Sequence, residues 1–303
     1  MIRVLLTGSQ GQLGFSIKEL APKGIKLLSF GRDQFDLSDL KNIKKNLENL
    51  KPDFIINCGA YTNVDLAEDE KEKVMNINAN SVKEISLYLK KNGGNLIQIS
   101  TDYVFDGLNS KAYKVNDKVS PINQYGYSKA KAEEFIQEIL GDTNQAVIIR
   151  TSWLMGTISK NFLLTMIKLH QSKKEINVVS DQISCPTSTK TLAEACWKVI
   201  KLKMDKNLYN FNCMPILHWC DNGIASWYDI AVAIGEISTK NGLINSPSII
   251  NPIKSENYPT KAKRPYFSLL DCTSSKEFLD LKGEYWRKSL EISIKSIVEN
   301  KKW

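Results

Sequence analysis

The 303-residue chain is 42% hydrophobic and 24% charged, a balance typical of a globular protein with a sizeable core. It has no apolar run long enough to span a membrane and no signal-peptide pattern, which argues against a membrane or secreted protein. The net charge of +8 comes from scattered lysines, which favours solvated helix faces over nucleic-acid binding and suits an anionic small ligand.

Strands and helices are predicted to alternate through the first half of the sequence. Short apolar runs predict strands at 2–7, 25–30, 53–58, 95–100 and 146–150. Helical periodicity predicts helices at 13–20, at 40–50, around 82–89 and from 124 onwards. This alternation predicts an α/β fold with a parallel sheet covered on both faces.

The second half of the sequence is less regular. A strand is predicted at 176–182 and helices at 189–203, 227–237 and 286–298, whereas 246–265 is rich in Pro, Asn and Ser and is predicted to be loop. We predict two domains: a nucleotide-binding domain over 1–154, to which 176–204 returns, and a smaller, irregular substrate-binding domain from 155–175 and 205–303.

Three glycines, Gly8, Gly11 and Gly14, lie between the first predicted strand and the first predicted helix. Glycine at these positions allows a tight turn and a close approach of the backbone to a pyrophosphate, which the helix N-terminus stabilises. The pattern favours dinucleotide binding, and a structural turn is the alternative.

Arg32 and Asp33 follow the second predicted strand, where the sequence should distinguish the two nicotinamide dinucleotides. An acidic residue there binds the ribose 2′-hydroxyl of NAD, whereas an arginine accepts the 2′-phosphate of NADP. We favour NADPH because Arg32 comes first, with NADH as the alternative cofactor and a plain surface charge as the alternative role of Arg32.

The stretch QYGYSKAK contains Tyr-x-x-x-Lys in two registers, Tyr125–Lys129 and Tyr127–Lys131. On a helix, Tyr125 and Lys129 share a face with apolar residues, whereas Tyr127 and Lys131 share a charged face. We therefore expect Tyr125 to be a proton donor whose pKa the Lys129 ammonium lowers. The alternative is a packed tyrosine beside a lysine that reaches out to solvent.

The six cysteines have no C-x-x-C spacing, and most lie in apolar contexts. We expect reduced core residues of a cytoplasmic protein, with neither disulfides nor a zinc site. They are Cys58, Cys185, Cys196, Cys213, Cys220 and Cys272.

Several sequence blocks together with the glycine loop resemble the extended short-chain dehydrogenase/reductases, and within them the dTDP-4-dehydrorhamnose reductase family. The blocks occur in family order over nearly the whole chain: NCGAYTNVDLAE, STDYVFDG, PINQYGYSK, RTSWLMG, DQISCPT, WYDIA and YPTKAKRPYFSLLD. The resemblance implies a Rossmann-type, doubly wound parallel sheet with a smaller substrate-binding domain.

The resemblance also implies site residues. The implied catalytic residues are Thr101, Tyr125 and Lys129. The implied cofactor-binding residues are Gly8, Gly11, Gln12, Leu13, Gly14, Arg32, Asp36, Leu37, Gly59, Ala60, Tyr61, Tyr125 and Lys129. The implied substrate-binding residues are Thr101, Asp102, Trp153, Asn161, Gln182 and Arg264, although Trp153 also fits the role of a core aromatic.

The implied activity is NADPH-dependent reduction of the C4 keto group of dTDP-4-dehydro-L-rhamnose. Another nucleotide-sugar reductase or epimerase of the same fold is one alternative. A non-catalytic NADP-binding regulatory subunit, like the partner of methionine adenosyltransferase, is the other.

Some relatives form a dimer bridged by magnesium through acidic residues, and the corresponding positions here are Ser16 and Lys190. A hydroxyl and an ammonium are poor ligands for a hard cation. We therefore expect no metal, in a monomer or homodimer that acts on a small nucleotide sugar.

Overall fold

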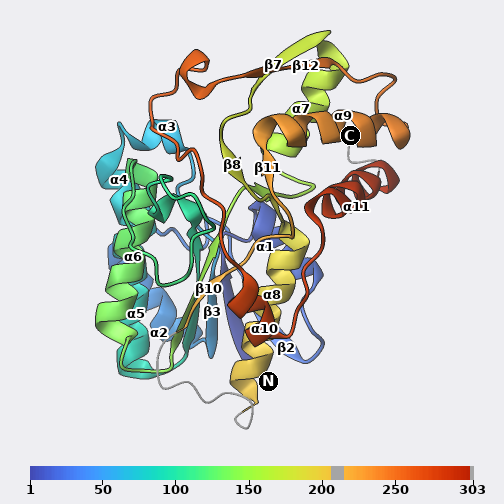
Figure 1. The fold of residues 1–303 in the computed structure, drawn as a ribbon. Coiled ribbons are helices and arrows are strands. Elements are labelled where there is room, and N and C mark those ends of the chain that lie inside the picture. The colour runs from blue at the N-terminus through green and yellow to red at the C-terminus, as the bar shows by residue number, and fades with distance from the viewer. Residues whose placement is uncertain (206–214, 301–303) are drawn as a thin grey trace.

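A six-stranded parallel sheet forms the centre of the computed structural model, which describes residues 1–205 and 215–300 (Figure 1). The strand order is β10-β5-β4-β3-β1-β2. The bounds are β1 (Ile2–Thr7), β2 (Ile25–Ser29), β3 (Phe54–Asn57), β4 (Asn95–Thr101), β5 (Ala146–Thr151) and β10 (Ile216–His218). The chain order reverses between β1 and β3, so a crevice is expected at their carboxyl ends.

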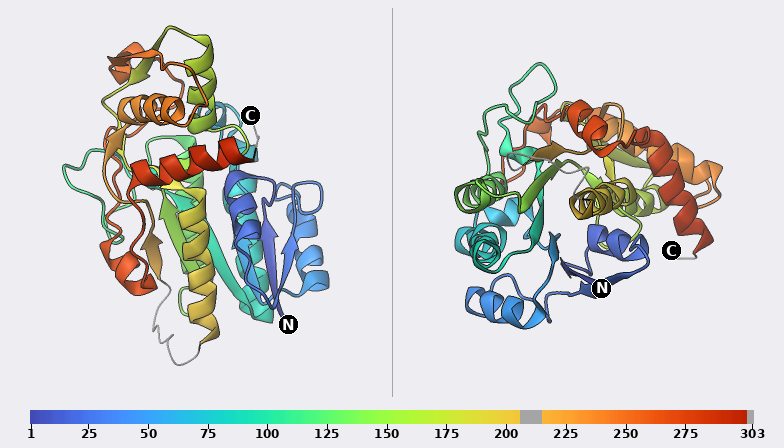
Figure 2. Two further views of the ribbon diagram at one scale, coloured as in Figure 1. Left: turned by 90° about the vertical axis from the view of Figure 1, so that its right-hand side faces the viewer. Right: turned by 90° about the horizontal axis from the view of Figure 1, so that it is seen from below.

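Helices cover both faces of this sheet, as the view from below shows (Figure 2). One face carries α1 (Gln12–Glu19) and α8 (Thr189–Met204), and the other carries α2 (Leu40–Leu50), α5 (Ser81–Asn92) and α6 (Gln124–Leu140). Alternate strand residues enter the two cores: Ile56 packs toward α1 and α8, whereas Ile55 packs toward the other three helices. Burial on both faces explains why the strand sequences are almost continuously apolar.

A second core lies beyond the carboxyl ends of the strands, in the upper part of Figure 1. It is built on α7 (Phe162–Ser172), α9 (Trp227–Lys240), α11 (Trp286–Glu299) and a two-stranded parallel sheet of β7 (Glu175–Val179) and β12 (Ile249–Ile253). Four two-residue strands form two small pairs. Strand β6 (Leu154–Met155) pairs with β9 (Thr187–Ser188), and β8 (Ile183–Ser184) pairs with β11 (Ala225–Ser226).

The remaining helical elements are short, of three to seven residues. They are α3 (Val64–Ala67), α4 (Lys71–Met75), α10 (Thr273–Leu279), the π-helical η1 (Asn76–Asn80) and the 3₁₀ turns η2 (Asp102–Val104) and η3 (Ser255–Asn257). No helix within the described ranges is long and apolar enough to cross a membrane.

The five strands predicted in the first half are confirmed, each to within one residue at either end. The prediction of a loop over 246–265 is wrong, because β12 and η3 lie within it. The sequence of β12, IINPI, contains Asn and Pro, which normally indicate a turn. Proline is tolerated here because β12 pairs only with β7 in the described part of the chain and so has a free edge.

The elements of the second half that were not predicted include α7 and β10, and β10 is a three-residue edge strand of the central sheet. The strand predicted at 176–182 ends at Val179 and pairs with β12, outside the central sheet, whereas α8 packs against α1. The division of the chain into two domains remains a prediction. Cys213 lies outside the described residues, and the other five cysteines are free.

A buried ion pair joins the sheet to α6. Arg150 Nη2 on β5 lies 2.6 Å from Glu133 Oε2 on α6, and the two side chains are 2% and 7% exposed. Arg150 Nε donates to both oxygens of the same carboxylate, and Ser100 Oγ at the end of β4 donates to it as well. His218 lies beside Arg150, and burial together with the Arg150 charge lowers the pKa of this histidine to about 3, which keeps it neutral.

Glu133→Ala should lower the free energy of unfolding by about 3–5 kcal/mol, because it leaves a buried guanidinium without its partner. Urea denaturation measures this loss. The control is Glu134→Ala, since Glu134 pairs with Lys131 at the surface and its loss should leave stability near the parent value. Equal losses in the two variants would contradict a structural role for the buried pair.

Candidate active site

A crevice of about 700 Å³ opens at the carboxyl ends of β1, β3, β4 and β5. Of the thirteen residues predicted to bind the cofactor, all line it: Gly8, Gly11, Gln12, Leu13, Gly14, Arg32, Asp36, Leu37, Gly59, Ala60, Tyr61, Tyr125 and Lys129. Their role in binding remains a prediction, but the structure brings them into one cavity.

The glycine loop fits a pyrophosphate. Gly8 has φ +64°, and a Cβ there would lie 2.6 Å from the backbone nitrogen of Gly59. A Cβ on Gly14 would lie 2.4 Å from the carbonyl oxygen of Gly8, so only glycine allows α1 to start this close to the loop. Helix α1 has no side-chain cap, which leaves its first N–H groups available to an anion.

Arg32 and Asp36 line the part of the crevice that follows β2, where the sequence predicted that NADP and NAD are distinguished. Arg32 lines the crevice, whereas the neighbouring Asp33 is not among its lining residues. The Arg32 side chain is 66% exposed, and its Nε lies 3.5 Å from Asp36 Oδ2. Burial tends to raise the pKa of Asp36, but hydrogen bonds from Ser38 and the Arg32 charge bring it below its usual value, so Asp36 is ionised.

The segment after β3 is held by an asparagine that the sequence did not reveal. The backbone N–H of Tyr61 donates to Asn78 Oδ1 at 2.7 Å, and Asn78 Nδ2 donates to the carbonyl of Tyr61 and to Ser128 Oγ, both at 3.0 Å. Asn78 lies in η1, a π-helical turn of the kind often found at functional sites. It thereby fixes the cofactor-facing backbone relative to α6.

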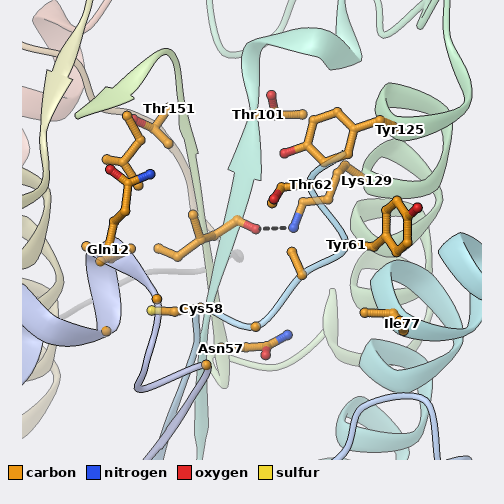
Figure 3. Close-up of a pocket in the computed structure, with 18 of the residues that line it drawn as sticks. Gln12, Asn57, Cys58, Tyr61, Thr62, Ile77, Thr101, Tyr125, Lys129 and Thr151 are labelled. Atoms are coloured by element: carbon orange, nitrogen blue, oxygen red, sulfur yellow. Dashed lines mark hydrogen bonds between the residues drawn. The ribbon is translucent and has the colours of Figure 1, made fainter. Parts of the chain in front are cut away.

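Thr101, Tyr125 and Lys129 all line the crevice, and Figure 3 shows their side chains converging from β4 and α6. Lys129 is 3% exposed, whereas Tyr127 is 50% exposed and Lys131 pairs with Glu134. The predicted orientation of the two registers is confirmed. The catalytic roles themselves remain a prediction.

The predicted effect of Lys129 on Tyr125 is wrong for this structure. Burial raises the pKa of Tyr125 to about 12, a hydrogen bond with Thr101 opposes the rise, and the charge of Asp102 adds to it. Lys129 Nζ donates to the carbonyl of Ile99 at 2.6 Å, the dashed line in Figure 3. Burial lowers the pKa of Lys129 to about 8, despite the nearby Glu133 carboxylate. In this structure the Lys129 ammonium thus bonds to the backbone of β4 and is not among the causes of the Tyr125 pKa shift.

Two stacked tryptophans separate the crevice from a second cavity. The Trp153 and Trp227 rings lie 3.8 Å apart at 17°, and Trp153 adopts a positive φ of 44°. Trp227 lines both cavities and donates through Nε1 to Gln182 Oε1 at 3.2 Å. Trp227 was not predicted as a site residue, although the WYDIA block that contains it follows a Ser226 helix cap.

The second cavity, of about 1100 Å³, is lined by two more predicted substrate residues, Gln182 and Arg264. Arg264 forms a bidentate ion pair with Asp65: Nη1 donates to Oδ1 at 3.1 Å and Nη2 to Oδ2 at 2.7 Å. Asn161, in contrast, lines neither cavity. Its side chain caps α7 by accepting from Leu164 N and donates to the carbonyl of Gly156, so the structure gives it a capping role.

Of the two positions at which the resemblance predicted metal ligands in relatives, Ser16 lies at the contact between α1 and α8, whereas Lys190 is exposed. Ser16 Oγ donates to Thr189 Oγ1 at 2.7 Å, which joins the two helices by a neutral hydrogen bond. In the described ranges no three His, Cys, Asp or Glu side chains are grouped as metal ligands. The independence from metal remains a prediction.

A glycine loop at the switch point of a doubly wound parallel sheet, facing a threonine, a tyrosine and a lysine, defines a Rossmann-fold NAD(P)-dependent oxidoreductase of the short-chain dehydrogenase/reductase type. The family model described as RmlD substrate binding domain matches residues 2–299, and the chain belongs to this family.

Three similar proteins illustrate the relationship. The spore coat polysaccharide biosynthesis protein SpsK of Bacillus subtilis (strain 168) is 36% identical, with 96% of each chain covered. The dTDP-4-dehydrorhamnose reductase of Aggregatibacter actinomycetemcomitans is 31% identical, with 96% of this chain and 98% of the relative covered. The crystal structure of the Bacillus anthracis dTDP-4-dehydrorhamnose reductase in complex with NADP is 32% identical, has a TM-score of 0.86, and covers 97% and 99% of the two chains.

Tyr125→Phe should lower turnover by about 10²-fold or more, because it removes a proton donor and keeps the ring. Tyr127→Phe is the matched control and should stay within a few-fold of the parent, since Tyr127 is on the exposed face. Steady-state kinetics with NADPH and a 4-keto sugar nucleotide measure both. The opposite ranking would assign the chemistry to the other register.

Proposed function

We propose that this protein reduces the C4 keto group of dTDP-4-dehydro-L-rhamnose to a hydroxyl with NADPH, as a cytoplasmic step in making dTDP-L-rhamnose. The observation that carries the proposal is the convergence of Thr101, Tyr125 and Lys129 in the dinucleotide crevice, beside the Trp153–Trp227 stack. The family's dTDP-4-dehydrorhamnose reductases support the choice of substrate.

Thr101, Tyr125 and Lys129 have separate roles in the reduction of the ketone. The residues that line the crevice, the glycine loop among them, would hold NADPH, which would supply the hydride that reduces C4. As the carbon–oxygen π pair moves onto oxygen, Thr101 donates a hydrogen bond to that oxygen and Tyr125 gives it a proton, which solvent later restores. Lys129, whose ammonium bonds to the end of β4 in this structure, would add positive charge to the crevice and donate to a ribose hydroxyl of the bound cofactor. Acid–base assistance of this kind is worth about 10²- to 10⁴-fold in rate.

Burial of the two ionisable groups, Tyr125 and Lys129, suits these roles. Burial raises the pKa of Tyr125 to about 12, so the phenol keeps its proton at neutral pH until the substrate oxygen becomes basic. Burial lowers the pKa of Lys129 to about 8, so its ammonium form is only weakly favoured at neutral pH. An oxygen atom that accepts a hydrogen bond from the ammonium would stabilise the charged form.

Turnover of dTDP-4-dehydro-L-rhamnose with stoichiometric oxidation of NADPH tests the proposal. An epimerase would convert its nucleotide sugar with no net consumption of NADPH, and a regulatory subunit would bind NADPH and oxidise none of it. Either result with the purified protein would replace the reductase assignment.

Arg32→Ala should raise the Michaelis constant for NADPH about tenfold or more and leave that for NADH nearly unchanged, because a charge-assisted contact with the 2′-phosphate disappears. The two constants are measured at saturating keto sugar. Equal effects on both cofactors would return Arg32 to the role of a surface charge.

Exhaustive chelation with EDTA should leave turnover and molecular mass unchanged, whether the protein is a monomer or a homodimer. The expectation follows from the neutral Ser16–Thr189 contact at the position where relatives place an acidic ligand. Kinetics and size-exclusion chromatography with and without added magnesium give the answer. Loss of activity and mass with EDTA, restored by magnesium, would show that other residues bind the metal.

A further inference from the structure

Ser268 forms a buried hydrogen bond with Asp102, the residue that follows Thr101 in the sequence. Ser268 Oγ donates to Asp102 Oδ2 at 2.5 Å, and the two residues are 1% and 2% exposed. The backbone of Ser268 is held independently of this bond: its N–H donates to the carbonyl of Ile183 at 2.9 Å, and its carbonyl accepts from Ser184 Oγ at 3.2 Å. The Ser268 hydroxyl is thus a fixed donor aimed at one carboxylate oxygen.

The other oxygen of Asp102 bonds to the threonine of the reaction centre. Thr101 Oγ1 donates to Asp102 Oδ1 at 3.0 Å and accepts from the N–H of Tyr103 at 3.2 Å. A hydroxyl has a single proton. In this structure the proton is donated to Oδ1, so the position of the Asp102 carboxylate fixes the Thr101 side chain, and the proton becomes available to a ketone oxygen when a ketone binds and the hydroxyl turns.

We propose that Ser268 is a positioning residue for the reduction, which holds the Asp102 carboxylate and, through Oδ1, keeps the Thr101 side chain in place, so that its hydroxyl can turn to the substrate oxygen when a ketone is bound. The proposal rests on the proposed function for its kinetic arm. It assigns a task to a residue that lies 166 positions away from Asp102 in the sequence and contributes nothing to the lining of the crevice.

The surroundings of Asp102 make its orientation sensitive to this one donor. Burial raises the pKa of Asp102 to about 7, and the hydrogen bonds from Ser268, from Thr101 and from backbone N–H groups oppose the rise. Tyr125 of α6 and Tyr103 of η2 face the carboxyl, and both phenols have pKa values that burial raises. Behind Tyr103 lies the Arg264–Asp65 ion pair, whose charges offset each other.

Removal of the Ser268 hydroxyl should change the pKa of Asp102 in one direction, upward. The bond stabilises the ionised carboxylate, so its loss raises the pKa of Asp102 further. Any limb of the pH–rate profile that arises from Asp102 then moves to higher pH in Ser268→Ala, by about one pH unit for the loss of one charge-assisted hydrogen bond. This shift is a readout that a merely structural serine would not give.

The experiment compares Ser268→Ala with Ser268→Thr, which keeps a hydroxyl, and with Ser184→Ala. Ser184 is equally buried, and its hydroxyl bonds to the carbonyl of Ser268 and not to Asp102. Ser184→Ala therefore removes one backbone contact of Ser268 but keeps the Ser268 hydroxyl and its N–H bond to Ile183. We expect Ser268→Ala to lose about tenfold in kcat with the Michaelis constant for NADPH unchanged, and to shift the pH profile upward. Ser268→Thr should recover both, and Ser184→Ala should keep the parent profile.

A second arm is independent of turnover. Infrared difference spectra follow the protonation of the buried carboxyl, whose band is identified by its loss in Asp102→Asn. Its titration should move to higher pH in Ser268→Ala and stay in place in Ser184→Ala. If no ketone is reduced, the proposed function fails while this arm still decides whether Ser268 controls Asp102.

Two results would overturn the inference. One is a fall in kcat and thermal stability in Ser268→Ala without a shift of either titration, which would make the serine structural only. The other is parent-like kinetics and titration in Ser268→Ala. If Ser268→Thr does not fold, the contrast between Ser268→Ala and Ser184→Ala still decides.

Discussion

The Arg150–Glu133 ion pair is the constraint on which the active site depends. It connects β5 to α6 in a place that water does not reach, and Ser100 adds the end of β4 to the same carboxylate. A buried pair tolerates little displacement, because its Coulomb energy and its hydrogen bonds are needed to offset the desolvation of both ions. Helix α6 is therefore fixed in rotation, and with it the tyrosine and lysine that face the crevice.

One physical cause, the loss of hydration, acts on Asp102, Tyr125 and Lys129 in the proposed reaction centre. It raises the pKa of Asp102 to about 7 and that of Tyr125 to about 12, and it lowers that of Lys129 to about 8. Each shift favours the uncharged form. The centre thus holds groups whose charge depends strongly on what binds beside them, a common property of catalytic sites.

The sequence predicted most of the central sheet and the residues of the dinucleotide crevice, because both follow from local patterns. Strands buried on both faces are continuous apolar runs, and the phasing of α6 separates Tyr125 from Tyr127 by burial alone. The raised pKa of Tyr125 could not be predicted, since it depends on how deeply the fold buries the phenol and on the nearby Asp102 charge. Asn78 and Ser268 were missed for the same reason: each acts through hydrogen bonds to residues that are distant in the sequence.

The proline in β12 bears on how the molecule avoids association through its outer edge. The N–H of Ile249 donates toward β7, so in a parallel ladder the N–H groups of alternate residues face the same way, and position 252 faces outward. Pro252 has no N–H, and the neighbouring Lys254 side chain is 73% exposed and charged. A missing donor and a nearby ammonium are features that keep a free strand edge from recruiting a further strand. The isoleucine-rich edge can therefore stay in water without seeding a cross-chain sheet.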